Sequence, residues 1–461
     1  MKILQEPNGW VINRYGKIFS RMDYGPNPRL HRYILTIASD DENTLLYNGI
    51  TKELVKFEQG DDLFDKKFFD TIWFVPDEYD EAILAMDIKE KLANNRKKVW
   101  EPVGYTILTT TDCNARCFYC YEKGILKKNM SDKTAEDVAD YIIKNYKKKS
   151  EENSGTTISP VALSWFGGEP LFNKRVIDII TSKLKSNGVP YTSSMISNGY
   201  LFDEGTILVA KTKWNLKSVQ ITIDGTKDNY KKAKNYIYKD ENPLETVLGN
   251  ILALSMNGIR VSIRVNIGYY NCEDISKLVD VIADRFKGNK NVSMYIHALF
   301  DHGGVTDITD EEKDEKVFSE MTKIDNKIRE FGLGNMRLLD NSIKSTHCMA
   351  DNCRHAVIQC NGDITLCEHY VDSQKYTSIY SDEKDEEIAE KFRKVALPFN
   401  RCYFCPLIMD CSFLEMCEDN EGDCSKARQN YRVNNKFEEI KRLTEQKEKQ
   451  EQKIINENGR K

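Results

Sequence analysis

The sequence lacks long apolar runs, a charge surplus of one sign and, before Cys113, any cysteine. No stretch reaches the ~18–20 apolar residues that a membrane span requires, and the opening MKILQEPNGWVINRYG lacks the apolar core of a signal peptide. The 67 basic and 72 acidic residues leave a formal net charge of −5, which gives no reason to expect a nucleic-acid or membrane partner. We therefore expect a cytoplasmic protein that binds neither.

The thirteen cysteines are unevenly distributed along the 461 residues. Three lie between Cys113 and Cys120, Cys272 stands alone, and nine lie between Cys348 and Cys424. Clustered cysteines in a reducing compartment indicate metal binding or catalysis rather than disulfides, whereas inert buried thiols would be scattered. The length predicts two or three domains, and 40% apolar residues are enough for their cores.

Residues 1–98 are predicted to form a small α/β domain. Apolar residues alternate in one run as in a strand buried on at least one face, and helical spacing appears further along. The expected elements are a strand at 33–38, a second apolar run at 45–47 with an Asn48-Gly49 turn, and helices at Thr51–Phe57 and Glu81–Leu92.

Residues 99–335 alternate between strand and helix patterns. The expected strands are Val103–Thr110, Val161–Phe166, Tyr191–Ser197, Ser218–Asp224, Arg260–Ile267 and Val292–Leu299. Helical spacing runs from Ala135 to Ile143 behind a Ser131 cap, and again from Leu244 to Leu254. Six strand–helix units imply a parallel sheet, so we predict an α/β fold with a partial (β/α)6 barrel. Sites on such barrels lie in the loops that follow the strands.

The last part of the chain has little periodicity. Residues 336–427 carry most of the cysteines, and we expect this domain to be held by metal clusters more than by an apolar core. Residues 428–461 are dominated by Lys, Glu, Gln and Asn. We predict a solvated helix and a frayed tail there and assign it no function.

A compact cysteine motif, Cys113-x3-Cys117-x2-Cys120, follows the first predicted barrel strand. A [4Fe–4S] cluster takes four ligands and this loop offers three, which would leave one coordination position open for chemistry. The segment CNARCFYC resembles the CxxxCxxC signature of radical S-adenosylmethionine (SAM) enzymes. The resemblance implies that SAM binds the fourth iron and is cleaved to methionine and a 5′-deoxyadenosyl radical. A zinc knuckle built on Cys117 and Cys120 is the alternative.

Further segments resemble this family at the ends of the predicted strands. The resemblance implies that Gly167, Gly168 and Glu169 of SWFGGEP, Ser197 and Asn198 of ISNGY, Asp224 of QITIDG, Arg264 of RVNI and Tyr119 contact SAM. The Glu169 carboxylate suits the ammonium group of SAM, and the planar guanidinium of Arg264 suits the carboxylate of SAM. The open alternatives are a barrel salt bridge for Arg264 and a turn-capping carboxylate for Asp224.

The C-terminal cysteines resemble the SPASM extension of peptide-modifying radical SAM enzymes, which binds two auxiliary [4Fe–4S] clusters. The Gly-x4-Cys and Cys-x2-Cys-x5-Cys parts match, but the gap before Cys417 is longer than the family's. The resemblance assigns one cluster to Cys348, Cys353, Cys367 and Cys417, and the other to Cys402, Cys405, Cys411 and Cys424. With the first site, three clusters use eleven cysteines. Cys272 and Cys360 remain, and we expect them to be core or surface thiols.

The resemblance also implies a function. IDGTKDNYKKAKNY, YIYKDENP and RVNIGYYN are similar to maturases of ribosomally made, cysteine-containing peptides, which install thioether or carbon–carbon cross-links. Such an enzyme would bind a precursor peptide with a leader and receive electrons from a flavodoxin or ferredoxin. Residues 1–98 would bind the leader peptide; the alternative is a lid domain that covers the barrel and does not contact the leader. Glu368 would accept a proton from the substrate, with His369 as a weaker candidate; the alternative is that Glu368 is only a surface carboxylate.

Two other functions stay open. An anaerobic sulfatase maturase, which forms formylglycine from Cys or Ser, shares every cluster motif, although the distinct N-terminal unit speaks against it. A non-catalytic iron–sulfur electron-transfer protein is the alternative of another class. It would need neither an open iron nor the polar groups around a three-cysteine cluster.

Overall fold

The computed structural model describes residues 1–39, 43–58, 60–62, 64–94, 99–152, 159–299, 311–334, 340–343, 346, 348–394, 400–411 and 424–458, without the side chains of 38, 39, 450 and 452–458. The chain forms two compact units. Unit 1 combines Met1–Arg96, Met336–His347 and Arg393–Lys461, and unit 2 combines Lys97–Asn335 and Cys348–Phe392. The residues expected to form one cysteine-rich domain at 336–427 are thus shared between the units.

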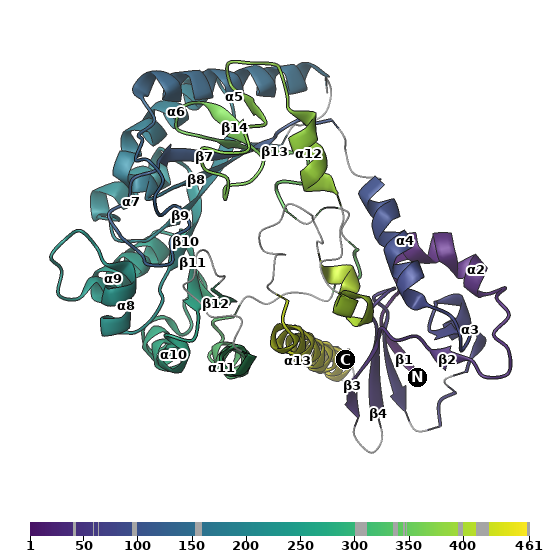
Figure 1. The fold of residues 1–461 in the computed structure, drawn as a ribbon. Coiled ribbons are helices and arrows are strands. Elements are labelled where there is room, and N and C mark those ends of the chain that lie inside the picture. The colour runs from purple at the N-terminus through teal and green to yellow at the C-terminus, as the bar shows by residue number, and fades with distance from the viewer. Residues whose placement is uncertain are drawn as a thin grey trace. The chain divides into compact units, whose positions relative to one another are not determined.

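Unit 2 is built on parallel strands. They are β7 (Gly104–Thr110), β8 (Val161–Gly167), β9 (Tyr191–Ser197), β10 (Leu216–Thr222), β11 (Arg260–Ile267) and β12 (Val292–Ala298). Each pairs in parallel with the next along the chain (Figure 1). The six expected strands and the parallel sheet are therefore confirmed. The carboxyl ends of all six strands lie at one edge, which is where the loops with the unusual residues begin.

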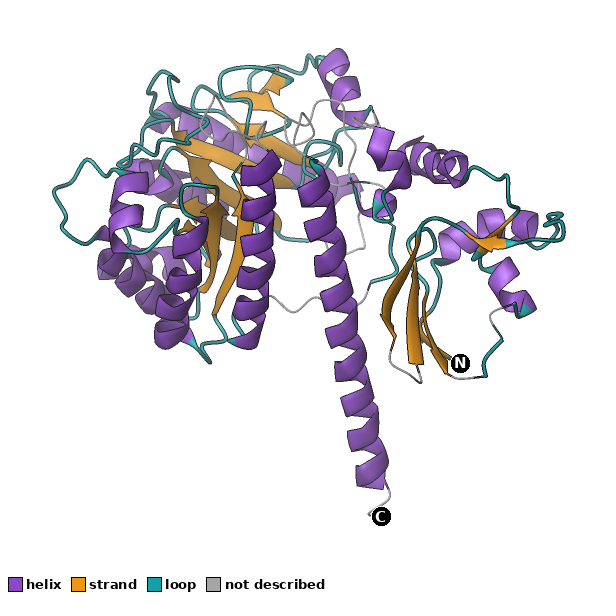
Figure 2. Cartoon of the chain, turned by 60° about the horizontal axis from the view of Figure 1, so that its bottom comes forward, coloured by secondary structure: helices purple, strands orange, loops and turns teal. Residues whose placement is uncertain are grey.

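Helices connect these strands and cover the sheet (Figure 2). They are α5 (Asp132–Glu152), α6 (Lys174–Ser186) after a 3-10 turn, η2 (Pro170–Asn173), then α7 (Glu204–Thr212), α8 (Lys227–Lys234), α9 (Pro243–Met256), α10 (Cys272–Phe286) and α11 (Glu311–Glu330). The expected cap of α5 is present, because the Ser131 hydroxyl accepts a hydrogen bond from the Thr134 N–H at 3.0 Å. No helix among the described residues combines the length and apolar character needed to cross a membrane.

The sheet of unit 2 continues into the cysteine-rich segment. Strand β13 (His355–Ile358) pairs in parallel with β7, and β14 (Asp363–Thr365) and β15 (Thr377–Ser378) follow as antiparallel strands. Helix α12 (Glu386–Arg393) ends the segment. Ala356 to Ile358 and Ile364 are fully buried. An apolar core therefore supports this part of the chain, whereas the lack of periodicity predicted little core; strands of two to four residues are too short to show a period.

Unit 1 contains an antiparallel sheet with the order β1-β5-β4-β3. Its strands are β1 (Lys2–Gln5), β3 (Ile34–Ser39), β4 (Asn43–Asn48) and β5 (Leu54–Glu58), beside a two-stranded sheet of β2 (Arg29–Leu30) and β6 (Phe74–Val75). The helices are α1 (Gly9–Val11), the π-helix η1 (Ile12–Gly16), α2 (Lys17–Phe19), α3 (Lys66–Asp70) and α4 (Glu81–Asn94). The strands expected at 33–38 and 45–47 and the helix at Glu81–Leu92 are present.

The helix predicted at Thr51–Phe57 is wrong. The segment turns at residues 49–51 and then forms β5, which pairs with both β4 and β1. Leu54, Val55 and Phe57 match a helical face as well as a strand, and a run this short does not distinguish the two periods. Pairing with a strand on each side favours the strand over the helix, because it satisfies the backbone hydrogen-bonding groups of β5 along its length.

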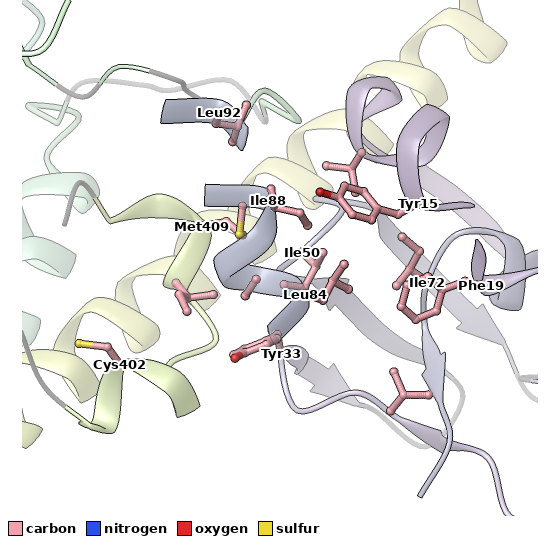
Figure 3. Packing of buried hydrophobic residues seen from close by; sticks show 14 residues of the cluster. Tyr15, Phe19, Tyr33, Ile50, Ile72, Leu84, Ile88, Leu92, Cys402 and Met409 are labelled. Carbon is pink, nitrogen blue, oxygen red and sulfur yellow. The ribbon is translucent and has the colours of Figure 1, made fainter. Parts of the chain in front are cut away.

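The C-terminal segments of unit 1 share a core with its N-terminal part. Two 3-10 turns, η3 (Asn400–Phe404) and η4 (Ile408–Asp410), are followed by the long helix α13 (Lys426–Asn458). Cys402, Ile408 and Met409 are buried in one cluster with residues of α4, and Met409 lies beside Ile88 in Figure 3. Ile440 of α13 is buried in a second cluster against β3, β4 and β5. Helix α13 is therefore part of a core and not only a solvated tail.

Candidate functional site

The loop that carries the first cysteines is attached to the end of β8. The Gly168 N–H donates to the Thr110 carbonyl, and the Glu169 N–H donates to the Asp112 carbonyl, both at 3.0 Å. The approach is so close that a Cβ on Gly168 would lie 2.4 Å from the Asp112 carbonyl oxygen. Gly167 has a φ of +122°, which also favours glycine. The two glycines therefore bring the backbone of β8 against the cysteine loop.

Glu169 is a fully buried carboxylate at the centre of this edge. It accepts hydrogen bonds from the Ser197 hydroxyl at 2.9 and 3.0 Å, the Asn198 N–H at 2.8 Å and the Leu171 N–H at 3.1 Å. Burial raises the pKa of Glu169 to about 7, against the lowering effect of these bonds. Three of the predicted residues thus form one cluster, and a cationic ligand would favour the charged carboxylate.

Asn198 connects this cluster to the cysteine loop. Its side-chain amide donates to the Asn114 Oδ1 at 2.6 Å and lies 3.7 Å from the Cys113 sulfur, as a weak donor. The Cys113 sulfur also accepts from the Ala115 N–H at 3.3 Å. The Asn114 Nδ2 is buried and has no hydrogen-bond partner within the described structure. An acceptor on a bound ligand would satisfy this donor.

Asp224 and Tyr119 form a second polar group with Lys234, which the sequence did not single out. The buried Asp224 carboxylate accepts from the Tyr119 hydroxyl, from the Lys234 ammonium at 2.8 Å and from the Asn266 N–H at 3.0 Å. Lys234 is only 3% exposed and also donates to the Tyr119 hydroxyl at 2.8 Å. Tyr119 and Asp224, which were each expected from the resemblance to contact SAM, thus lie in direct contact, and a buried cation joins them.

Lys234 also holds the cysteine loop through its backbone. Its carbonyl accepts from the Arg116 N–H at 2.9 Å and lies 3.9 Å from the Cys117 sulfur. Burial alone would lower the pKa of the Lys234 ammonium. The negative charges of Asp224 and Cys117 raise it by a larger amount, so the pKa of Lys234 lies above its usual value. Helix α8 ends at this lysine, and Asn235 follows in the left-handed region. The only sequence signal was a lysine shortly after the pair Lys231-Lys232, which is typical of a solvated face.

Arg264 lies in β11, opposite Thr222 of β10 and Tyr295 of β12. Its Nε donates to the Asn266 Oδ1 at 2.9 Å. Within the described residues, Arg264 forms no ion pair. The barrel salt bridge that was its alternative interpretation is therefore not found in the part of the chain that the structure describes.

Residues of the cysteine-rich segment lie beside the first loop. The Tyr121 and His369 rings are stacked, with centroids 4.8 Å apart and planes 3° from parallel. Burial raises the pKa of Tyr121, and the charges of Glu122 and Glu368 raise it further. Burial also raises the pKa of Glu122 to about 7. Glu368 and His369 are thus near the first loop and are half-buried, and Glu122 is a perturbed carboxylate that the sequence analysis missed.

The remaining cysteines divide between the two units. Cys348, Cys353 and Cys367 belong to unit 2, whereas Cys402, Cys405, Cys411 and Cys424 belong to unit 1. Cys417 lies outside the described residues. The two spare cysteines, Cys272 and Cys360, are buried thiols near backbone carbonyls, at 3.6 Å from Tyr269 and 3.3 Å from Leu108 respectively.

The chemistry of these donors fits iron–sulfur clusters. The twelve cysteines of the described ranges are not in disulfides, so their sulfur atoms can serve as ligands. In the same ranges no three Cys, His, Asp or Glu side chains meet as they would around one metal ion. A four-iron cube takes one thiolate on each iron, so its ligands need not meet at one point. Burial raises the pKa of Cys113 to about 12 and that of Cys120 to about 11.

Comparison with known sequences finds a family match that includes this loop. Residues 88–241 match the family described as a 4Fe-4S single cluster domain. An uncharacterized protein of Methanocaldococcus jannaschii is 26% identical over 157 residues. The alignment covers 32% of this chain and 47%, about half, of that protein.

Comparison with solved structures defines the fold. Native anSMEcpe with bound AdoMet and a Cp18Cys peptide is 15% identical, with a TM-score of 0.52 over 74% of this chain and 98% of that one. Native anSMEcpe with bound AdoMet is 14% identical, with a TM-score of 0.53 over the same shares. SuiB of Streptococcus suis bound to S-adenosylmethionine has a TM-score of 0.45 at 15% identity, over 84% and 95%. The chain has the fold of radical SAM maturases with SPASM-type domains.

Proposed function

We propose that this chain is a radical SAM enzyme that abstracts hydrogen from a ribosomally made precursor peptide and installs a thioether or carbon–carbon cross-link. The observation that carries the proposal is the edge of the barrel sheet. There the loop from Cys113 to Cys120 adjoins two buried polar groups, one around Glu169 and one around Asp224. The fold is shared with a protein whose structure contains both AdoMet and a peptide.

We assign a separate role to each residue at this end of the sheet. Cys113, Cys117 and Cys120 would hold a [4Fe–4S] cluster, which with SAM supplies a 5′-deoxyadenosyl radical when bound. Glu169, kept in place by Ser197 and Asn198, would bind the SAM ammonium, and Arg264 its carboxylate. Tyr119, held by Asp224 and Lys234, would support the adenine. Glu368 would take up a proton, and a flavodoxin or ferredoxin would deliver electrons.

SAM cleavage tests this assignment of the cysteines. Replacing Cys113, Cys117 and Cys120 together by Ala should abolish 5′-deoxyadenosine formation by the anaerobically reconstituted protein. The auxiliary cysteines are unchanged in this variant, so their iron should remain. Cys272→Ala, which removes a buried thiol outside the proposed ligands, is the control and should cleave SAM normally. Continued 5′-deoxyadenosine formation by the triple variant would contradict the proposal.

Iron content tests the number of clusters. Three cubes predict about twelve iron and twelve sulfide per chain after reconstitution. A value near four iron would remove the two auxiliary clusters from the proposal and leave only the first. Mössbauer spectra with and without SAM would also exclude a non-catalytic electron-transfer protein, because only an open iron changes its signal when SAM binds.

Formylglycine formation is the second candidate, because the structure with a TM-score of 0.52 contains the Cp18Cys peptide. A cysteine converted to formylglycine loses its sulfur and two hydrogen atoms and gains an oxygen atom, whereas a cross-linked peptide loses only hydrogen. Mass spectrometry of a cysteine-containing peptide after turnover therefore separates the two candidates. A leader-dependent loss of hydrogen supports the cross-link, and oxygen incorporation into a leaderless peptide supports formylglycine.

A further inference from the structure

An asparagine inside the first cysteine loop has a side-chain donor that no atom of the described residues accepts. Asn114 lies between Cys113 and Cys117 and is fully buried, and its Nδ2 has no hydrogen-bond partner there. This nitrogen is closed to solvent, so bulk water does not supply an acceptor. A buried amide hydrogen without an acceptor is costly, because it has lost its bonds to water and gained none. The donor therefore indicates a further group in this loop.

The hydrogen bonds of a neighbouring asparagine fix which end of the Asn114 amide is the donor. The Asn198 Oδ1 accepts from the Tyr200 N–H at 3.0 Å, so the Asn198 Nδ2 is the atom that donates to Asn114, at 2.6 Å. The acceptor in that bond must be the Asn114 Oδ1. Exchanging the two ends of the Asn114 amide would place two NH2 groups against each other. The remaining atom, Nδ2, is therefore a donor.

Both asparagines are also held at the backbone. The Asn114 carbonyl accepts from the Ile237 N–H at 2.9 Å. The Asn198 N–H donates to the buried Glu169 carboxylate at 2.8 Å. The donor at Asn114 thus belongs to a segment that is fixed by bonds to two other parts of unit 2.

The Cys113 sulfur lies beside both amides. It is 3.8 Å from the Asn114 Oδ1 and 3.7 Å from the Asn198 Nδ2. The bonds of the amide carbon keep the Asn114 Nδ2 no more than about 2.6 Å from its own Oδ1. A cube bound to Cys113 begins one bond beyond this sulfur and carries sulfides, which accept hydrogen bonds. SAM, in contrast, enters and leaves through solvent, to which this donor is closed.

The inference rests on the proposed function, which assigns Cys113, Cys117 and Cys120 to a [4Fe–4S] cluster. We propose that the Asn114 Nδ2 donates a hydrogen bond to a sulfide of this cluster and that the Asn198 Nδ2 donates to the Cys113 thiolate. Reduction adds one electron and makes the cluster more negative by one, so donors at its sulfurs stabilise the reduced form. The bond from Asn198 to the Asn114 Oδ1 polarises the second amide and strengthens it as a donor. The two linked amides thereby raise the reduction potential of the cluster that cleaves SAM.

Redox titration followed by electron paramagnetic resonance, without SAM, tests the proposal on the reconstituted full-length protein. The signal that disappears when Cys113, Cys117 and Cys120 are replaced by Ala belongs to the first cluster. Its midpoint potential should move to more negative values in Asn114→Leu, which is similar in size but has no donor. Asn187→Leu, which replaces an exposed asparagine at the end of α6, is the matched control. It should keep the potential of the unmodified protein.

Asn114→Asp keeps the test decisive where Asn114→Leu fails to take up the cluster. Its carboxylate retains an acceptor for Asn198 but lacks the amide hydrogens, so its potential should also be more negative. An unchanged potential in the variants that keep the iron of the unmodified protein would overturn the proposal. Loss of the cluster from both variants would overturn it as well, because one hydrogen bond to sulfide does not hold iron that three thiolates bind.

Titration with SAM separates the remaining outcomes. An unchanged potential together with a higher SAM concentration needed to alter the signal would overturn the proposal in favour of a contact between Asn114 and SAM. If no signal disappears in the triple cysteine variant, the proposed function fails and this inference fails with it. The two failures are therefore distinguishable.

Discussion

Single charged side chains, buried with their partners, organise both units. In unit 2, Lys234 connects Asp224, Tyr119 and the backbone of the cysteine loop. A buried ion pair adds little over an apolar pair of the same shape, but loss of one partner leaves the other charge unpaired. The role of Lys234 is therefore best tested by removing it with and without its counter-charge.

Lys234→Met should destabilise unit 2 by about 3–5 kcal/mol, because Asp224 would remain buried and charged. The double variant with Asp224→Asn should recover a large part of that loss. Chemical denaturation of the metal-free protein measures both. Lys232→Met, on the same helix but exposed, should change stability little. Equal losses in the single and double variants would show that Lys234 and Asp224 are not coupled.

His31 makes the stability of unit 1 depend on pH. It is 3% exposed; its Nδ1 accepts from the Tyr33 N–H at 3.2 Å, so its Nε2 donates to Asn48 at 3.1 Å. Burial lowers its pKa from 6.5 to about 4. The unfolded chain binds the proton first as pH falls, so stability is lost between about pH 6.5 and 4, by about 3 kcal/mol in total.

Hydrogen exchange of β3 and β4 at several pH values measures this effect. His31→Gln should be less pH-dependent in that window, whatever its stability at pH 7. His355→Gln is the control, because burial also lowers the pKa of His355 to about 4 but this residue lies in unit 2. Identical pH profiles for His31→Gln and the unmodified protein would exclude His31 as the source.

Among the elements, the end of β8 packs closely against the loop that follows β7. Gly168→Ala would place a Cβ 2.4 Å from the Asp112 carbonyl oxygen and 3.1 Å from the Cys113 Cβ. We expect the cysteine loop to shift and reconstituted iron to fall by about four per chain. Gly249→Ala, in α9 with no atom within 4 Å of the added Cβ, should keep all its iron. Full iron in Gly168→Ala would show that the loop tolerates the displacement.

The elements that could be predicted are those with long, regular patterns. The strands Tyr191–Ser197 and Arg260–Ile267 have the expected bounds, because alternating helices and strands of unit 2 repeat over many residues. β5 was misassigned because a short apolar run fits two periods and its partner strands are not local. Lys234 was missed for a similar reason. It lies in a segment rich in charged and polar residues, and only tertiary structure shows which cation is buried.

At the scale of the molecule, unit 1 is held together by residues from both ends of the sequence. The Tyr33 hydroxyl donates to the Tyr403 carbonyl at 2.6 Å, and Cys402 and Met409 complete the core around α4. The interpretation of residues 1–98 as a separate, leader-binding domain predicts that their removal leaves the barrel folded and SAM cleavage intact but weakens peptide binding. The shared core predicts that the rest of unit 1 is affected as well.

Deletion of residues 1–95 should uncover the apolar side of the segment from Cys402 to Met409. We expect reconstituted iron to fall from about twelve to about eight per chain, with increased aggregation. SAM cleavage by unit 2 is the internal control and should persist in the soluble fraction. A truncated protein with all its iron would show that the C-terminal segments of unit 1 hold their cluster alone.

The division of the sequence between the units also has a consequence for synthesis. The N-terminal part of unit 1 ends at Arg96, and its C-terminal part starts at Arg393. The ribosome therefore makes about 300 residues, most of them in unit 2, between these two parts. At 5–20 residues per second, the ribosome takes roughly 15–60 s over that interval. During this time β3, β4 and α4 exist without the residues that complete their core. The barrel of unit 2 can therefore fold before unit 1, whose N-terminal part reaches its final packing only after the C-terminal part has been made.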